Sequence, residues 1–130
     1  MSRQIHIVCI SGTREKLQMA AMIASVAAAS GDAVTVFLSM NALSYFVKGH
    51  DENAPAEGDF GTLLAQKEGV PAFQQLFHQA AELGDAKLLP CSMAVDLMKL
   101  SDEDLDPVLG PPTGLTRFLS HSEGGELLTF

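Results

Sequence analysis

The chain has 130 residues, of which 47% are hydrophobic, and a formal net charge of -8. This length is enough to bury the core of one ordinary domain, so we expect a single domain over residues 1–130. With only 8 lysines and arginines and no basic run, a nucleic-acid partner is excluded, because affinity for phosphate backbones comes from clustered basic side chains. The mean hydropathy of +0.18 predicts either an unusually complete core or apolar surface buried against other subunits.

The two cysteines, Cys9 and Cys91, lie far apart in the sequence. They form no disulfide framework, and this usage fits a reducing compartment. Residues 1–10 lack the apolar segment and cleavage site of a signal peptide, and the most apolar run, residues 19–29, is too short to span a bilayer. We therefore expect a cytoplasmic protein that does not enter membranes.

The first half of the chain alternates strand and helix patterns. Residues 4–10 (QIHIVCI) are dense in β-branched side chains and predict a buried parallel strand, with Cys9 as a core residue rather than a resolving thiol or metal ligand. Residues 14–30 predict an Ala-rich helix with Thr13 as its N-cap and Gly31 at its end. Residues 33–38 predict a second strand, and residues 41–48 a helix that Asn41 caps unless it lines a cleft.

A loop without periodicity follows at residues 49–61, where Gly, Pro and acidic residues gather. It is either a mobile cover over a site or an unconstrained surface excursion. Residues 62–67 predict a short helical turn. The next helix starts at Pro71, presents one apolar face, carries His78 on its surface and ends at Gly84.

The last third of the chain contains the stretch KLLPCSMAVDLM, residues 87–98. Residues 86–89 predict a short buried strand that Pro90 closes, since proline cannot donate to the sheet. Cys91 then opens a helix on which Met93 and Met98 are expected in the core and Asp96 in an ion pair with Lys99. A turn at residues 101–104, a loop at 106–110, a helix at 111–120 and a strand at 126–130 complete the chain.

This order of elements predicts an α/β fold: a doubly wound, mainly parallel sheet of four or five strands, with helices on both faces and flavodoxin-like layering. In such sheets ligands bind at the carboxyl ends of the strands. Three loops reach that edge, and their small and polar residues can line a pocket beside Cys91; these are Ser11, Gly12, Thr13, Ser39, Asn41 and Ser92.

Cys91 is the candidate reactive residue. The start of a helix leaves backbone N–H groups unpaired and carries the positive end of the helix dipole, which favours a thiolate. The alternative is a buried cysteine that serves only as a small hydrophobic side chain.

Other site chemistries lack their motifs. Ser11-Gly12-Thr13 follows a strand, but it is neither GxGxxG nor GxxxxGK[ST], and only Tyr45 is available to stack on a flavin ring. No CxxC or HxxxH occurs, and His6 and Cys9 point to opposite faces of their strand. We expect neither a cofactor nor a metal.

The segment LPCSMAVDLMKLSDEDL resembles the cysteine segment of the DsrE/DsrF/DsrH-like sulfur-carrier family, especially the DsrE-like branch that carries the label "peroxiredoxin family". In that branch a Cys-x-Met-x-x-Asp-hydrophobic-Met run follows a strand and carries a persulfide. Cys91, Met93, Asp96 and Met98 match it. The segment AVTVFLSMNAL is similar to the family's second strand and the helix after it, and EGVPAFQQLFHQAAELGDAKLLPC is similar to its third helix and the strand before the cysteine.

The resemblance implies a sulfurtransferase-like carrier that relays sulfane sulfur as a Cys91 persulfide between thiols, in sulfur trafficking or sulfur oxidation. It also implies TusA-like or rhodanese-like partner proteins and a homo-oligomer, for which we expect a trimer. The alternative is a non-catalytic module that binds a small anion or a protein segment and in which Cys91 is inert.

Overall fold

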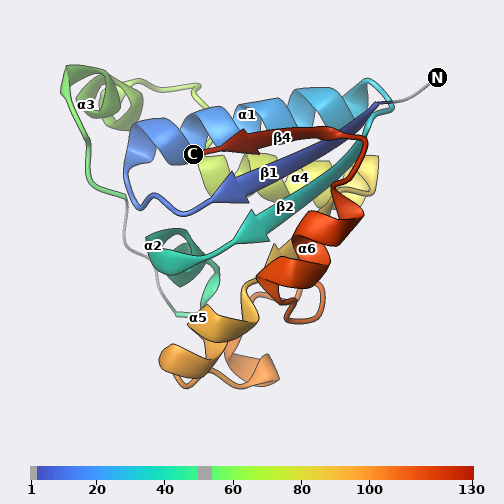
Figure 1. Cartoon of the computed structure of the whole chain (residues 1–130). Coiled ribbons are helices and arrows are strands. Elements are labelled where there is room, and N and C mark those ends of the chain that lie inside the picture. Colours follow the sequence, from blue (N-terminus) through green and yellow to red (C-terminus); the bar gives the residue numbers. More distant parts are fainter. Residues whose placement is uncertain (1–2, 50–53) are drawn as a thin grey trace.

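The computed structural model describes residues 3–49 and 54–130 of the chain. Four parallel strands form one sheet in the order β3-β2-β1-β4 (Figure 1). They are β1 (Gln4–Cys9), β2 (Ala33–Leu38), β3 (Lys87–Pro90) and β4 (Glu126–Thr129). The predicted α/β class with a parallel, doubly wound sheet is confirmed.

Six α-helices and two 3-10 helices connect these strands in the described residues. The α-helices are α1 (Arg14–Ala29), α2 (Met40–Leu43), α3 (Asp59–Gln66), α4 (Phe73–Gly84), α5 (Ser92–Leu97) and α6 (Leu115–His121). The 3-10 helices are η1 (Ser44–Phe46) and η2 (Asp102–Asp104). In residues 3–49 and 54–130, no helix combines the length and hydropathy needed to cross a membrane.

The helices lie on both sides of the sheet because the direction in which successive strands are added to the sheet reverses after β3. The steps from β1 to β2 and from β2 to β3 run the same way, so right-handed crossovers put α1 and α4 on one face. The return from β3 to β4 runs the opposite way and puts α6 on the other face (Figure 1). The two faces are therefore covered by different parts of the chain.

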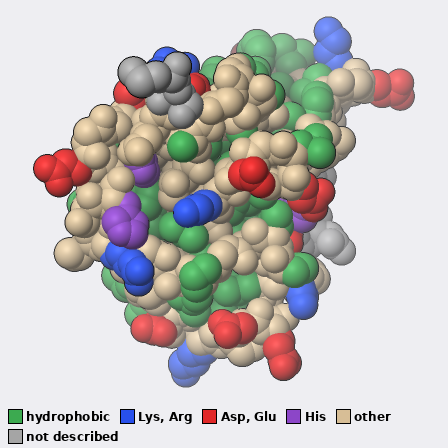
Figure 2. Space-filling view, turned by 90° about the vertical axis from the view of Figure 1, so that its right-hand side faces the viewer, with side chains coloured by type: hydrophobic (Ala, Val, Ile, Leu, Met, Phe, Trp, Pro, Cys, Tyr) green, Lys and Arg blue, Asp and Glu red, His purple; other side chains and the backbone are tan. Residues whose placement is uncertain are grey.

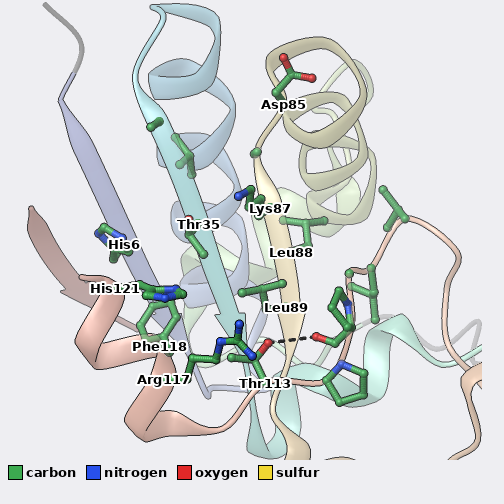
Figure 3. A pocket seen from close by; sticks show the side chains of 18 of the residues that line it. His6, Thr35, Asp85, Lys87, Leu88, Leu89, Thr113, Arg117, Phe118 and His121 are labelled. Carbon is green, nitrogen blue, oxygen red and sulfur yellow. Dashed lines mark hydrogen bonds between the residues drawn. The ribbon is translucent and has the colours of Figure 1, made fainter. Parts of the chain in front are cut away.

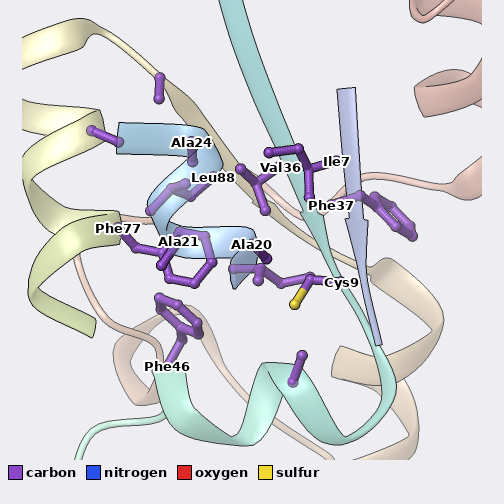
Figure 4. Packing of buried hydrophobic residues seen from close by; sticks show 14 of the residues in the cluster. Ile7, Cys9, Ala20, Ala21, Ala24, Val36, Phe37, Phe46, Phe77 and Leu88 are labelled. Atoms are coloured by element: carbon purple, nitrogen blue, oxygen red, sulfur yellow. The ribbon is translucent and has the colours of Figure 1, made fainter. Parts of the chain in front are cut away.

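Strand register divides the side chains between these faces, since residues in register share a face and neighbours along a strand alternate. One face packs against α1 and α4 and forms the main core; it carries Ile5, Ile7, Cys9, Val34, Val36, Leu38 and Leu88 (Figure 4). The opposite face, toward α6, carries His6, Val8, Thr35, Phe37, Lys87 and Leu89.

Helices α1 and α4 approach each other closely because their contact is made of small residues. A methyl group on Gly84 would lie 2.5 Å from Cβ of Ala28, so glycine is required there. Phe77 of α4 and Phe46 of η1 fill the core beside this contact, with ring centroids 5.6 Å apart (Figure 4).

Several boundaries differ from the sequence prediction. Helix α3 begins at Asp59, inside the predicted 49–61 loop, and residues 50–53 of that loop lie outside the described residues. Ser39, not Asn41, is the N-cap residue of α2. His78, predicted as a surface residue, has a half-exposed side chain, but its Nε2 lies 2.7 Å from Oδ2 of Asp106, and this contact ties α4 to the loop after η2.

The prediction that Met93 and Met98 lie in the core was wrong. Only Ala94 and Val95 of α5 are buried, whereas Met93, Leu97 and Met98 are exposed by 47%, 74% and 40%. The helix is short and sits at the carboxyl edge of the sheet, so one side of it faces solvent (Figure 1). The predicted ion pair between Asp96 and Lys99 does not form; both side chains are exposed, and Lys99 adopts a left-handed backbone with φ of 54°.

Candidate functional site

Cys91 lies where β3 passes into α5. Its backbone is extended, and it is the N-cap residue of α5 rather than a residue of the first turn. Its N–H donates to the carbonyl of Leu38 at 2.8 Å, which continues the pairing of β3 with β2, and its carbonyl accepts from Val95 at 3.0 Å. The thiol is free, and the residue is only 5% exposed.

The segment of residues 110–114 forms a wall beside Cys91, which the sequence did not reveal. Thr113 pairs with Cys91 in an isolated parallel bridge. The N–H of Ser92 donates to the carbonyl of Thr113 at 3.0 Å, and the N–H of Thr113 donates to the carbonyl of Pro90 at 2.9 Å. The N–H of Ser92 is therefore occupied, and no side chain caps α5. The backbone N–H groups of Met93 and Ala94, in the first turn of this helix, are left open.

Cys9 sits at the corresponding end of β1 but in a different environment. It is fully buried on the α1 and α4 side, and burial raises the pKa of its thiol to about 12. In the register, Cys9 pairs with Leu38 and Leu38 with Pro90, so β2 separates the two cysteines. Two strand spacings and one residue of offset put their Cα atoms about 10 Å apart, too far for a disulfide. The prediction of Cys9 as a core residue is confirmed.

The structure brings the three predicted edge loops together. Ser39 N–H donates to the carbonyl of Cys9 at 3.0 Å, and a methyl group on Gly12 would lie 2.9 Å from Cβ of Asn41. Ser39 is buried, whereas Asn41 is exposed. That these residues line a ligand pocket with Cys91 stays a prediction.

The side chains of Ser11 and Thr13 are used within the protein. Their hydroxyl oxygens lie 3.0 Å apart. Thr13 is the N-cap residue of α1 as predicted, but its hydroxyl donates to a carboxylate oxygen of Glu57 at 3.2 Å and makes no capping hydrogen bond to the helix. Glu57 belongs to the predicted 49–61 loop, of which residues 54–58 dock on the start of α1. The N–H groups of Glu57 and Gly58 donate to the Glu15 carboxylate at 2.8 and 2.7 Å.

In the part of the chain that the structure describes, no group of three or more His, Cys, Asp or Glu side chains is arranged so that it could hold a metal ion. His6 and Cys9, which share β1, lie on opposite faces of the sheet as predicted.

Comparison with known proteins places the fold and the family. No curated protein matches the chain. Two solved structures match over 100% of both chains: the ychN protein from E. coli, with a TM-score of 0.69 and 16% identity, and MTH1491, a protein of unknown function from Methanobacterium thermoautotrophicum, with 0.57 and 12%. At these identities they show a shared fold. The model of the DsrE/DsrF/DrsH-like family matches residues 54–130, which include β3, Cys91 and α5. The chain therefore belongs to the DsrE/DsrF/DrsH-like family.

Proposed function

We propose that the protein is a sulfur carrier that holds sulfane sulfur as a persulfide on Cys91. The observation that carries this proposal is the position of Cys91: a free thiol at the carboxyl end of a strand, inside the matched family region and beside open backbone amides. A persulfide is an anion, and the N–H groups of Met93 and Ala94 are suited to bind its outer sulfur.

The transfer is a pair of thiol exchanges that need no external oxidant. The Cys91 thiolate attacks the outer sulfur of a donor R–S–SH, which gives Cys91–S–SH and releases R–S⁻. An acceptor thiolate then attacks the outer sulfur on Cys91, which gives R′–S–SH and restores the Cys91 thiolate. Atoms and charge balance in both steps.

The exposed side of α5 is suited to receive the proteins that deliver and collect this sulfur. Met93, Leu97 and Met98 present flexible apolar side chains next to Cys91. Because Cys91 is almost buried, a docking protein has to displace part of the chain that surrounds it. Residues 110–114 are next to Cys91 and are hydrogen-bonded to its neighbours Pro90 and Ser92. TusA-like or rhodanese-like proteins in sulfur trafficking or sulfur oxidation are the proposed partners. We also propose that the protein is a homo-oligomer, specifically a trimer. A cytoplasmic location is part of the same proposal and agrees with the two free thiols.

The test is intact mass after brief incubation with inorganic polysulfide, on wild type, Cys9→Ser and Cys91→Ser. We expect added masses in multiples of one sulfur on wild type and Cys9→Ser, removed by reductant, and none on Cys91→Ser. A folded wild type that gains no sulfur contradicts the proposal. Sulfur on Cys9 alone would assign the chemistry to the other cysteine.

The burial of Cys91 favours a second candidate, a non-catalytic binding module in which this thiol is inert. Labelling with iodoacetamide at neutral pH separates the two. Labelling within minutes that is lost in Cys91→Ser supports the carrier, whereas labelling that needs global unfolding supports the module.

A further inference from the structure

We propose that the groove on the α6 side of the sheet is a binding site for a small organic anion that has an apolar body. The groove has a volume of about 770 Å³, within the usual range for small-molecule sites. It exists because α6 covers β1 and the adjoining part of β2, where Phe118 contacts Phe37 and His6, and leaves the outer part of this face open. Cys91 is not among its lining residues, and the proposal is independent of sulfur transfer.

The walls combine apolar surface with positive charge. Leu89 lies on the floor, and Val108, Pro111 and Pro112 form one side. Lys87 and Arg117 line the same space (Figure 3), and neither forms an ion pair with any acidic side chain in the described residues. In a chain of net charge -8, two unpaired cations in one groove favour an anionic occupant.

Histidines add hydrogen-bonding groups beside these cations. His6 is 5% exposed, and its Nδ1 is buried without a hydrogen-bond partner. Burial lowers the pKa of His6, so the ring is neutral at pH 7, and the tautomer with its proton on Nε2 avoids a buried unpaired N–H. Backbone hydrogen bonds at Glu126 and His121 act on the same ring in the opposite direction and raise its pKa, but burial outweighs them. His121 lies next to His6 (Figure 3).

The charges are arranged along the groove rather than around it. Figure 3 shows Asp85, the one acidic side chain of the lining, at the end opposite Arg117, with Lys87 between them. In the space-filling view, histidine and basic side chains lie along one side of exposed hydrophobic surface, and acidic side chains lie at its other borders (Figure 2). An anionic head is expected to pair with Lys87 or Arg117, with its apolar body over Leu89, which lies between them (Figure 3). Inorganic sulfate or phosphate alone is far too small to fill such a space.

The probe for this site is decanoate. Its binding to the full chain is measured by calorimetry and by the loss of fluorescence when it displaces bound anilinonaphthalenesulfonate. We expect saturable one-to-one binding that decanol and decyltrimethylammonium do not reproduce, because they lack the negative head. The variant Lys87→Gln with Arg117→Gln should weaken binding about tenfold or more, the usual scale for losing charge-assisted hydrogen bonds.

Two further variants locate the site. Thr35→Phe keeps the charge but fills the middle of the floor, a strand position that accepts an aromatic residue, and should abolish binding. Lys16→Gln with Lys67→Gln removes the same charge outside the groove and should change affinity less than twofold. Cys91→Ser should bind as wild type does, so a failure of sulfur loading and a failure of this site are distinguishable.

The proposal is overturned by any of three results. These are the absence of saturable binding to folded wild type, an equal loss of affinity in the Lys87/Arg117 and Lys16/Lys67 double variants, and equal binding of decanol. It is also overturned if Thr35→Phe changes the oligomeric state and leaves decanoate binding intact, since the groove would then be occupied by a second copy of the chain.

Discussion

The two cysteines show how far position decides the properties of one residue type. Cys9 and Cys91 both end parallel strands, and both are buried. Cys9 is enclosed between the sheet and helices α1 and α4, where no polar group stabilises a thiolate, so burial dominates. Cys91 is adjacent to open backbone amides and to a wall made of a single loop. The proposed chemistry therefore belongs to Cys91.

The raised pKa of Cys9 predicts a loss of stability at alkaline pH. The folded protein keeps the Cys9 proton up to about pH 12, whereas the unfolded chain releases it near 9.0, so stability falls as pH rises through this interval. We expect the free energy of unfolding to fall by up to about 1.4 kcal/mol per pH unit above 9 from this group. Urea denaturation of wild type and Cys9→Ala at about pH 8 and pH 10 measures it. Equal pH dependence in both proteins would contradict the prediction.

At the scale of elements, the contact between α1 and α4 depends on Gly84. Gly84→Ala should destabilise the protein by about 1–3 kcal/mol through overpacking against Ala28, although alanine favours a helix by about 1 kcal/mol. Thermal or urea unfolding measures the change. Ala28→Gly removes the opposing methyl group, so the double variant should lose less than the sum of the single variants. Strict additivity would show that the two residues do not touch.

The docking of residues 54–58 on α1 depends on Glu15. Hydrogen bonds from the N–H groups of Glu57 and Gly58 lower the pKa of Glu15, so its carboxylate holds them at neutral pH, and the contact is lost as pH falls through this lowered value. Glu15→Ala should increase hydrogen exchange at these two amides at neutral pH, measured by NMR, while Glu68→Ala, which changes an exposed residue elsewhere, should not. Unchanged protection in Glu15→Ala would refute this role.

At the scale of the whole molecule, the reversal of the chain after β3 creates both candidate sites. It first lays residues 110–114 along the outer edge of β3 beside Cys91 and then takes the chain to the second face of the sheet, where α6 covers only part of that face. The remaining open part is the groove with Lys87 and Arg117. One crossover therefore sets the cover of the thiol and the walls of the neighbouring groove.

The same architecture predicts that Cys9 and Cys91 do not form a disulfide in the folded state. They lie on strands separated by β2, about 10 Å apart between Cα atoms, and a disulfide needs less than about 7 Å. Oxidation of the native protein with diamide should leave the monomer's two thiols countable by alkylation and mass spectrometry. The same oxidation in urea should remove both. An internal disulfide formed under native conditions would show that the sheet opens.

Strand patterns, helix ends and the order of elements were readable from local sequence, because buried β-branched runs and glycines at helix ends act over a few residues. Residues 33–38 and the helix end before Gly31 came out as predicted. The exposure of Met93 and Met98 was not predicted. A helix sequence with apolar residues on most sides is compatible both with a core helix and with a short helix at the edge of a sheet.

Sequence alone determined the fold class, the family motif around Cys91 and the separate character of Cys9, because each depends on neighbouring residues. Tertiary structure alone decided what surrounds them. Thr113 lies against Cys91, Asp106 lies beside His78, and Lys87 and Arg117 line one groove, although each pair comes from segments far apart in the chain. No local pattern encodes such contacts. The crossover that brings α6 to the second face of the sheet makes the groove, and backbone pairing of residues 110–114 with the end of β3 places that segment beside Cys91.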